Sequence, residues 1–488
     1  MNLERLITAL APTDVVNRAS VEVRDLAYDA RAVRSGALFF CVPGLRHDGH
    51  DFAAGAVADG AVALVCVRPL PLPVPQLVVA DARRAMAVAA DVFFGSPTHD
   101  LRVAGVTGTN GKTTTAYLLA SIFAAAGLRA GLLGTVESRV GGVARPVTRT
   151  TPEAIDLQRA FREMLAGGDR ACAMEASSIA SALYRLDGTR FAALAFTNLT
   201  QDHLDFHGTM EEYFQAKRRL FVGAWPPPSA VNVGDAWGRR LADELRTRAA
   251  APLLTFGFDA DADVRPDGLQ LDGAGARFTA AGVQVESRLR GRFNVENALG
   301  AVAVGLLLGL SGEAIATGIA ALPGVPGRFE AVDEGQPFTL VVDYAHTPDG
   351  LENVLLTARE LAGAGGRVIA VFGAGGDRDR GKRPEMGRIA SELADIAIVT
   401  SDNPRSERPE AIIAEVVAGA RAKVEVEINR STAIARAVRL ARAGDVVVVA
   451  GKGHEQGQEV AGVLHPFDDR LVAAEALRAL RGDPGAAP

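Results

Sequence analysis

The chain has 488 residues, enough for roughly two to four domains that each bury a core. Its composition, 48% hydrophobic and 23% charged, is typical of a globular protein. A formal net charge of -6 argues against a general nucleic-acid partner, and three widely spaced cysteines argue against a disulfide framework or a zinc ribbon. The first residues lack the apolar core of a signal peptide, and the apolar runs are too short to span a bilayer. We therefore expect a cytoplasmic protein without membrane insertion.

Lysine is rare in this chain, although 52 residues are basic. A chain that uses arginine almost everywhere keeps lysine where a compact charge is needed, or where an amine must lose its proton. Lysine scarcity therefore makes each lysine a candidate functional residue. The lysines are Lys112, Lys217, Lys382, Lys423 and Lys452.

Residues 1–97 alternate short apolar strands with turns, which predicts a small α/β domain. The expected elements include strands such as Ala37–Val42 and Ala61–Val67 and a helix at Asp81–Phe94. Two polar loops, 29–31 and 43–49, are consistent with surface turns and equally with ligand-binding loops.

The stretch from Val103 to Thr115 predicts a phosphate-binding loop. An apolar strand enters a glycine-rich turn, and Lys112 and Thr113 open a helix that should run to about Ala126. Backbone N–H groups of such a turn and the positive end of the helix face an anion, the lysine adds a mobile charge, and the threonine hydroxyl suits Mg²⁺. Val106 stands where the general pattern has glycine or alanine, so the motif alone leaves an ordinary glycine turn open.

Residues 98–327 continue with alternating strand and helix patterns, which predicts a mostly parallel sheet with helices on both faces. The expected strands are Leu132–Val136, Ala171–Met174 and Phe191–Phe196. Ligands bind at the carboxyl ends of such strands, so Glu175, directly after the second strand, is placed to hold Mg²⁺. A helix expected at Met210–Phe221 carries Lys217, which helical context alone would favour as a solvated surface lysine.

Two histidines follow the third of these strands at the spacing of a helical zinc pair, His203 and His207. The glutamate of the zinc-protease motif is absent, because Leu204 holds its position, and Gly208 then breaks the helix. A zinc hydrolase is therefore disfavoured. His203, nearest the end of the strand, is the better candidate metal ligand.

Residues 328–488 again alternate strands and helices, after a rigid hinge predicted at Pro323–Arg328. The expected buried strands are Thr339–Asp343, Val368–Phe372, Ile396–Thr400 and Val446–Ala450. Each ends in a polar loop, and such loops converge on one edge of a parallel sheet, which predicts a binding face. The loop Gly373–Arg378 fails as a dinucleotide fingerprint, because the third glycine would fall on Arg378. The tail after Leu480, rich in Gly, Pro and Ala, is predicted to be disordered.

These motifs resemble the Mur ligase family, in order and spacing, over nearly the whole chain. The segments that carry the resemblance are Gly105–Thr113, Thr150–Pro152, Glu175–Ser178, Thr197–Asp205, Lys217 and Gly291–Asn297. The resemblance implies an α/β fold of three domains. These are a small N-terminal α/β domain (1–97) that binds the UDP-muramoyl substrate, a central P-loop ATP-binding domain with a parallel sheet (98–327), and a Rossmann-like α/β C-terminal domain (328–488) that binds an amino acid.

The resemblance also implies ATP, two Mg²⁺ ions and a carbamylated lysine, N6-carboxylysine, at Lys217. Carbamylation explains the residue type, because only a neutral primary amine captures CO₂ and arginine stays protonated. The residues implied to be catalytic are Lys112, Glu175, His203 and Lys217, and the implied metal ligands are Thr113, Glu175, His203 and Lys217. The residues implied to bind ATP are Gly108, Thr109, Asn110, Gly111, Lys112, Thr113, Thr114, Asn294, Asn297, Arg328, Asp343 and His346.

The segment Asp402–Arg405 resembles the signature of family members that add meso-diaminopimelate to UDP-N-acetylmuramoyl-L-alanyl-D-glutamate in peptidoglycan synthesis. Diaminopimelate has a distal carboxylate that lysine lacks, and a guanidinium matches a carboxylate with two parallel hydrogen bonds. The residues implied to bind diaminopimelate are Arg378, Asp402, Asn403, Pro404, Arg405, Gly451 and Glu455. We therefore expect a monomeric ATP-dependent carbon–nitrogen ligase that works through an acyl phosphate and releases ADP and phosphate.

The sugar-nucleotide side departs most from the family pattern. The residues implied to bind the UDP-muramoyl dipeptide are Ala30, Leu45, Arg46, His47, Thr150, Thr151, Ser177, Arg185 and Lys217. Relatives often have serine at the place of Ala30, asparagine at Arg149, and histidine and glutamine at Ile179 and Leu183. The details of sugar-nucleotide recognition therefore stay open.

Two alternatives remain beside a diaminopimelate-adding ligase. A sibling ligase, lysine-adding or folylpolyglutamate-forming, is disfavoured by Arg405 and by the separate first domain. A nucleotide-binding scaffold without catalysis predicts loss of Glu175, His203 or Lys217, and all three residues are present.

Overall fold

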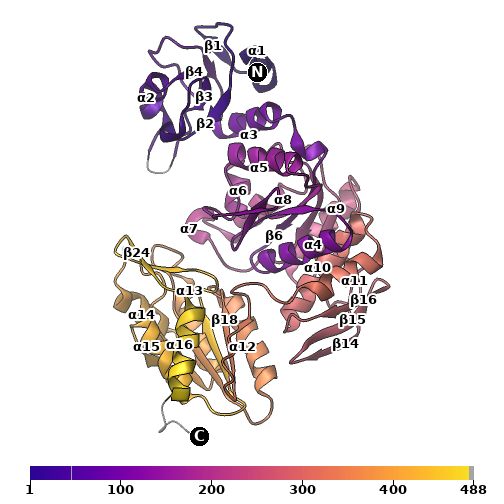
Figure 1. The fold of residues 1–488 in the computed structure, drawn as a ribbon, viewed down its shortest axis with the longest axis vertical. Coiled ribbons are helices and arrows are strands. Elements are labelled where there is room, and N and C mark those ends of the chain that lie inside the picture. Colours follow the sequence, from indigo (N-terminus) through magenta and orange to yellow (C-terminus); the bar gives the residue numbers. More distant parts are fainter. Residues whose placement is uncertain (45–46, 483–488) are drawn as a thin grey trace. The chain divides into compact units, whose positions relative to one another are not determined.

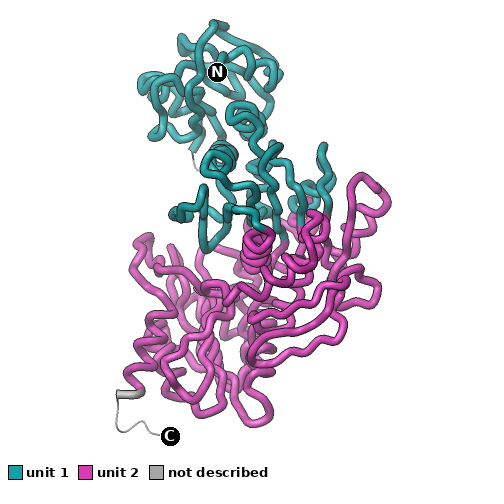
Figure 2. The backbone as a smooth tube through the Cα atoms, turned by 45° about the vertical axis from the view of Figure 1, so that its right-hand side comes forward, with its two compact units in different colours: residues 1–107, 127–194, 216–228 teal, residues 108–126, 195–215, 229–488 magenta. Residues whose placement is uncertain are grey.

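The computed structural model describes residues 1–44 and 47–482 as an α/β protein. The chain forms two compact units (Figure 2). Unit 1 consists of residues 1–107, 127–194 and 216–228, and unit 2 of residues 108–126, 195–215 and 229–488. The predicted sugar-nucleotide residues Leu45 and Arg46, and residues 483–488 of the predicted disordered tail, lie outside the described residues.

The elements of unit 1 begin with those of its first ninety-nine residues: α1 (Leu3–Leu10), β1 (Asp14–Val16), β2 (Asp25–Ala27), η1 (Ala30–Ala32), β3 (Ala37–Phe40), η2 (Gly49–Phe52), α2 (Ala53–Ala58), β4 (Ala61–Cys66), β5 (Gln76–Val78), α3 (Ala82–Phe93) and η3 (Pro97–His99). The later elements are β6 (Arg102–Thr107), β7 (Ala130–Leu133), β8 (Ser138–Val140), β9 (Val143–Arg145), α5 (Ala154–Ala166), β10 (Ala171–Glu175), α6 (Ser178–Ala182) and β11 (Phe191–Phe196), whose last two residues belong to unit 2.

The first sheet of unit 1 has the strand order β1-β5-β4-β3-β2, and only β1 runs antiparallel to its neighbour (Figure 1). Side chains alternate between its faces along each strand. Leu38 and Phe40 of β3 pack with α1 and α3, whereas Phe39 faces α2. The strand and helix predictions for this region are confirmed to within two residues at each end.

The second sheet contributes strands to unit 1 in the order β11-β6-β10-β7-β8-β9. β10 pairs in parallel with β6 and β7, and β8 and β9 add an antiparallel edge. The strand predicted at Leu132–Val136 is wrong in its second half. β7 ends at Leu133, because Gly134 turns the chain and its N–H donates to the Glu137 carbonyl.

The elements of unit 2 before residue 328 are α4 (Lys112–Ala125), α7 (Leu204–His207), α8 (Met210–Arg218, whose last three residues belong to unit 1), β12 (Ser229–Asn232), α9 (Ala236–Arg248), β13 (Leu253–Phe256), β14 (Asp267–Asp272), β15 (Gly275–Ala280), β16 (Val283–Ser287), α10 (Arg292–Leu307) and α11 (Gly312–Ala321). The later elements are β17 (Glu330–Ala331), β18 (Thr339–Asp343), α12 (Pro348–Ala362), β19 (Val368–Phe372), α13 (Lys382–Leu393), β20 (Ile396–Val399), α14 (Pro409–Ala418), β21 (Glu425–Val426), α15 (Arg430–Leu440), β22 (Val446–Ala450), β23 (Gly457–Val460), β24 (Val463–Pro466) and α16 (Asp469–Gly482).

The helix predicted after the phosphate loop is confirmed as α4, which packs closely on α11. Ser121 donates to the Gly318 carbonyl at 2.6 Å, and a side chain at Gly318 would collide with the backbone of Ile122. α10 is buried on nearly all sides, so apolar residues occur all round the helix and not on one face alone. The antiparallel sheet β14-β15-β16 was not among the predicted elements.

The last sheet has the order β17-β18-β22-β19-β20-β21, with parallel pairing from β18 to β21. Its central strands are buried on both faces, as their continuous apolar sequences predict. Val448 packs in a core with residues of α12, α13 and α14, whereas Val447 and Val449 pack in a core with residues of α15 and α16. The carboxyl ends of four strands therefore meet at one edge of the sheet, which confirms the predicted common edge.

None of the described helices is long and apolar enough to cross a membrane.

Candidate active site

The phosphate loop of unit 2 requires glycine at two positions. Gly108 and Gly111 have φ of +149° and +85°, which L side chains rarely adopt. A Cβ atom at Gly108 would collide with the Thr197 hydroxyl, and one at Gly111 would collide with the Asn297 amide. The backbone is thus held close to its neighbours at the N-terminus of α4, the geometry that binds a phosphate.

Side chains from the Thr197–Tyr213 stretch brace this loop. The Asn110 N–H donates to Asn198 Oδ1 at 2.8 Å, and the Thr109 hydroxyl accepts from the Thr200 N–H at 3.0 Å and lies 3.1 Å from the Tyr213 hydroxyl. Lys112 Nζ donates to the carbonyls of Gly108 and Thr109, at 3.1 and 2.7 Å. These bonds fix the loop before any anion binds.

Two asparagines on α10 lie beside the loop. Asn297 Nδ2 donates to Asn294 Oδ1 at 3.0 Å, and Asn294 Nδ2 donates to the Arg290 carbonyl at 2.8 Å. Both asparagines are buried. Unit 2 therefore brings Asn294 and Asn297 together with Gly111, as a shared nucleotide site requires.

Three more of the predicted ATP residues lie at the end of the predicted hinge or after it. Arg328 Nη2 donates to the Thr113 hydroxyl at 2.9 Å, and the Arg328 guanidinium lies 4.5 Å from the ring centre of Tyr344. Asp343 accepts from the N–H groups of Phe329 and Ala345 at 2.6 and 2.7 Å. Burial raises the pKa of the Asp343 carboxyl, and the nearby Arg328 charge opposes that rise. His346 Nε2 lies 3.7 Å from Asp202 Oδ2.

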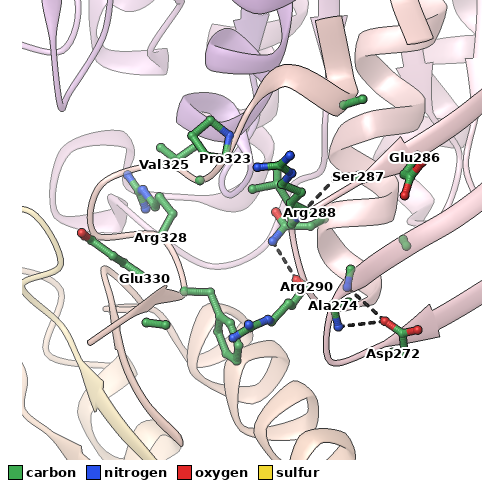
Figure 3. Close-up of a pocket in the computed structure, with 18 of the residues that line it drawn as sticks. Asp272, Ala274, Glu286, Ser287, Arg288, Arg290, Pro323, Val325, Arg328 and Glu330 are labelled. Carbon is green, nitrogen blue, oxygen red and sulfur yellow. Dashed lines mark hydrogen bonds between the residues drawn. The ribbon is translucent and has the colours of Figure 1, made fainter. Parts of the chain in front are cut away.

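A cavity of about 860 Å³ lies between the segment 323–331 and the strands β14 to β16 (Figure 3). Arg288, Arg290 and Arg328 are among the residues that line it. Asn294 lines it as well. The cavity therefore borders the predicted nucleotide residues, away from the loops predicted to bind the amino acid.

The loops predicted to bind the amino acid meet at the carboxyl edge of the last sheet. Arg405 has φ of +52°, its Nη1 donates to the Gly376 carbonyl at 2.6 Å, and its Nε lies 3.4 Å from Glu459. Asn403 Nδ2 donates to Glu455 Oε2 at 2.8 Å. Arg378 is exposed on the neighbouring loop. The predicted residues from these three loops thus share one face.

Asp402 is a buried carboxylate at the centre of this face. Burial acts to raise its pKa, but the charges of Lys452 and Arg430 outweigh burial and lower the pKa. Arg430 is held in turn by a pair of 2.7 Å bonds to Asp469. A side chain at Gly451 would collide with Asp402 Oδ2, so the glycine keeps the two loops in contact.

Glu175 lies in unit 1 at the end of β10, as predicted, and is buried. Its carboxylate accepts from the Thr135 N–H at 2.7 Å and from the Thr135 hydroxyl at 3.2 Å. The Thr151 hydroxyl donates to the Glu175 carbonyl at 2.7 Å and accepts from the Ser177 N–H at 3.2 Å. Thr151 therefore fixes the backbone that carries Glu175.

Lys217 lies in the last turn of α8 with only 1% of its surface exposed. The alternative of a solvated surface lysine is therefore wrong. Arg219, two residues on, is anchored by hydrogen bonds to Asp187 and to the Ser181 carbonyl.

The predicted sugar-nucleotide residues are spread over unit 1. Ala30 opens the short helix η1, whereas His47 is exposed and packs edge-on to Phe52. Arg185 Nη2 lies 2.9 Å from Glu153, and burial lowers the pKa of its guanidinium. Ser177 caps α6 by accepting the Ala180 N–H at 3.3 Å.

His203 and His207 do not lie on one helix. His203 has φ of +55° and precedes α7, which spans only Leu204–His207. His207 stacks on Tyr213 at 4.9 Å between ring centres. This geometry agrees with the rejection of a helical zinc pair, because only a continuous helix places residues four apart on one face.

Three models of one family match most of the chain. The model described as Mur ligase family, catalytic domain, matches residues 22–93, the Mur ligase middle domain matches residues 106–305, and the Mur ligase, glutamate ligase domain, matches residues 327–453. The chain belongs to the Mur ligase family.

Curated relatives of this Mur ligase share nearly its whole length. One from Solibacter usitatus (strain Ellin6076) is 48% identical over 94% of each chain, and one from Geobacillus kaustophilus (strain HTA426) is 45% identical over 98% of this chain and 99% of its own. Both are named UDP-N-acetylmuramoyl-L-alanyl-D-glutamate--2,6-diaminopimelate ligase.

Solved structures agree with the family. One, described as a UDP-N-acetylmuramoyl-L-alanyl-D-glutamate--2,6-diaminopimelate ligase, is 34% identical, covers 94% of this chain and 95% of its own, and has a TM-score of 0.66. MurF from Acinetobacter baumannii, 20% identical with a TM-score of 0.66 over 98% of this chain and 97% of its own, shares the fold.

Several residues that sequence reasoning missed contact the predicted ones in this Mur ligase. Asn110 Nδ2 donates to Asp349 at 2.6 Å. Lys382 lies 3.8 Å from Asp202, a carboxylate that itself lies 3.7 Å from the predicted residue His346. Lys452 donates to Asn403 at 2.9 Å. Lysine scarcity pointed to Lys382 and Lys452 without giving them a role, whereas no sequence pattern pointed to Asp349.

Proposed function

We propose that this Mur ligase joins meso-diaminopimelate to the D-glutamate of UDP-N-acetylmuramoyl-L-alanyl-D-glutamate, with ATP as the energy source, in peptidoglycan precursor synthesis. The choice of amino acid rests on one observation. Arg405, which donates to the Gly376 carbonyl, lies on the same face as the hydrogen-bonded pair of Asn403 and Glu455. A guanidinium and a carboxylate side by side suit the carboxylate and ammonium of one amino-acid centre.

The reaction divides into two steps. The glutamyl carboxylate attacks the γ-phosphorus of ATP, which forms an acyl phosphate and releases ADP. The free amine of diaminopimelate then attacks the acyl carbonyl, loses a proton and expels phosphate, so that one amide forms for each ATP split. Phosphoryl transfer of this kind depends on charge neutralisation and alignment.

On the phosphate side, the loop Gly108–Thr114 supplies N–H donors and Lys112 supplies a charge for the β- and γ-phosphates. Asn294 and Asn297 on α10, Arg328 at the end of the predicted hinge, and Asp343 and His346 after it complete the ATP site. The Thr113 hydroxyl and the buried Glu175 carboxylate are hard oxygen donors of the type that Mg²⁺ prefers, and His203 and a carbamylated Lys217 complete the assigned ligands. Two bound Mg²⁺ ions would neutralise the charge that develops on the phosphate oxygens.

On the amino-acid side, Arg405 and Arg378 bind the distal carboxylate of diaminopimelate. Glu455 accepts hydrogen bonds from the distal ammonium. The residues that shape the loops around Glu455 are Asp402, Asn403, Pro404 and Gly451. On the sugar-nucleotide side, the residues proposed to bind the UDP-muramoyl dipeptide are Ala30, Leu45, Arg46, His47, Thr150, Thr151, Ser177, Arg185 and Lys217. Thr151 acts there by holding the backbone of Glu175 and Ser177.

The organisation proposed with this function is a cytoplasmic monomer of three domains, 1–97, 98–327 and 328–488. Sedimentation of the purified protein at working concentration should show one species of 50.9 kDa.

The function is tested by phosphate release from ATP in the presence of the dipeptide nucleotide. Release should require meso-diaminopimelate, and L-lysine should support it on the order of 100-fold less well, as expected when a buried partner for a charged group is lost. Equal rates with lysine would make a lysine-adding ligase correct. Absence of release with either amino acid would favour a scaffold without catalysis.

The carbamate at Lys217 has its own test. Lys217→Ala should lose most activity, and added formate or acetate should restore part of it by supplying a carboxylate. Lys423→Ala is the matched control, because Lys423 is exposed. Near-native turnover of the Lys217 variant would exclude the carbamate role.

A further inference from the structure

Lys452, in the loop after β22, is fully buried at 0% exposure. It is one of the few lysines of an arginine-rich chain. Its Nζ donates to Asn403 Oδ1 and to Glu455 Oε2, both at 2.9 Å. A compact ammonium fits this position, whereas the planar fork of arginine needs more room and a different arrangement of acceptors.

Lys452 helps to set the orientation of the Asn403 amide. Asn403 Oδ1 accepts from Lys452 and from the Glu459 N–H at 3.0 Å, so two donors require the oxygen to lie on that side. Asn403 Nδ2 is then directed at Glu455 Oε2, 2.8 Å away. Both hydrogen bonds to the Glu455 carboxylate end on Oε2, and no described residue donates to Oε1.

The charged side chains around the Lys452–Asn403–Glu455 hydrogen bonds include one more carboxylate than cation. Three carboxylates, Asp402, Glu455 and Asp469, interact with two cations, Lys452 and Arg430, as one set. The Tyr344 ring lies beside this set, 5.4 Å from the ring of His454, and the opposite charges of Asp202 and Arg328 also act on it. The set therefore carries one net negative charge. A substrate ammonium at Glu455 Oε1 would neutralise it.

We infer that Lys452 is a positioning residue which, through Asn403, makes Glu455 present Oε1 to the distal ammonium of the amino-acid substrate. The distal ammonium is thus recognised by the Lys452–Asn403–Glu455 chain and the distal carboxylate by Arg405, as two separate determinants of one substrate. The role of Lys452 rests on the proposed function, because it needs a diamino acid as substrate.

The two determinants can be separated with two analogues. L-2-Aminopimelate keeps the distal carboxylate and lacks the ammonium, whereas L-lysine keeps the ammonium and lacks the carboxylate. The measurement is kcat/KM for each amino acid by phosphate release, in the wild type and in Lys452→Met. The preference for meso-diaminopimelate over aminopimelate should fall about 10-fold or more in the variant, mainly through KM, as expected for a lost charge-assisted contact.

The same variant should keep the preference for diaminopimelate over lysine within about 3-fold, and KM for ATP should not change, because Arg405 and the phosphate loop are untouched. Lys452→Arg should not restore the ammonium preference. Lys423→Met, at an exposed lysine, is the matched control. Circular dichroism checks folding, and Asn403→Leu, which removes the relay without removing the lysine, should lose the same preference.

Equal losses with all three amino acids would show that Lys452 only supports the fold. An unchanged ratio of diaminopimelate to aminopimelate in both variants would overturn the inference while leaving the proposed function intact. A wild type without diaminopimelate-dependent phosphate release would instead overturn the proposed function.

Discussion

The phosphate loop and the amino-acid face both hold charged groups, but they are built in opposite ways. The phosphate loop is a run of consecutive residues, Gly108–Thr114, whose backbone provides the donors. The face predicted to bind the amino acid is assembled from loops at 373–378, 402–405 and 451–455, whose side chains bond to one another and to the Gly376 carbonyl. A site built from backbone recognises any phosphate, whereas a site built from a side-chain network can distinguish one amino acid from another.

Gly111→Ala should break the phosphate loop with the largest effect. Its Cβ would collide with Asn297 at a φ of +85°. The displaced donors should lower kcat/KM for ATP on the order of 1000-fold, equally for every amino acid. Gly309→Ala is the matched control, since Gly309 has φ of +70° and open space around it. A Gly111 variant with changed amino-acid preference would contradict the separation of the two regions.

Arg405→Lys should act on the other region alone. The lysine keeps the charge and loses the planar fork, so kcat/KM for diaminopimelate should fall about 10- to 100-fold while that for lysine stays nearly constant. Arg408→Lys serves as control, because the Arg408 side chain is 84% exposed. A parallel fall for both amino acids would remove Arg405 from carboxylate recognition.

Gln458→Ala should also affect only the region predicted to bind the amino acid, and less strongly than Arg405→Lys does. Gln458 on β23 donates to the Asp402 carbonyl at 2.6 Å and to the Ser401 hydroxyl at 3.0 Å, so it supports the loop that carries the predicted substrate-binding residues. KM for diaminopimelate should rise about 5-fold, the size of one neutral hydrogen bond, with kcat unchanged. Gln456→Ala, at an exposed glutamine two residues away, should have no effect on KM.

The smallest expected effects concern the pH dependence of stability. The contributions of Asp343, on the phosphate side, and Asp402, on the amino-acid side, to the free energy of unfolding should change with pH in opposite directions. Asp402 has a lowered pKa, so its contribution to the free energy of unfolding is present above about pH 3.9 and is lost as pH falls through the folded pKa. Asp343 has a raised pKa, so its contribution is present below about pH 3.9 and is lost as pH rises through the folded pKa.

Urea unfolding of Asp402→Asn and Asp343→Asn between pH 3 and 8 should therefore diverge from the wild type in opposite directions, by on the order of 1 kcal/mol. Asp100→Asn, at an exposed aspartate, should follow the wild type. Parallel behaviour of the two buried variants would show that their surroundings do not differ in the way the charges indicate.

The sequence predicted most of the parallel strands because they are continuous apolar runs, and four of them, at 191–196, 339–343, 368–372 and 446–450, match to the residue. It did not predict β14 to β16, whose Asp267–Asp272 strand is largely exposed and lacks such a run. For the candidate site, Gly108 and Gly111 could be recognised from local sequence. The buried state of Lys217 could not, because burial depends on elements distant in the chain.

By itself, the sequence determined the resemblance to a Mur ligase and predicted the phosphate loop and a role for Arg405, because each depends on residue types at short spacing. Only the tertiary structure decided which oxygen of Glu455 accepts the hydrogen bonds of Asn403 and Lys452. Lys452, Asn403 and Glu455 come from two loops about fifty residues apart, and the pleated, parallel order β22-β19-β20 brings the ends of their strands to one edge.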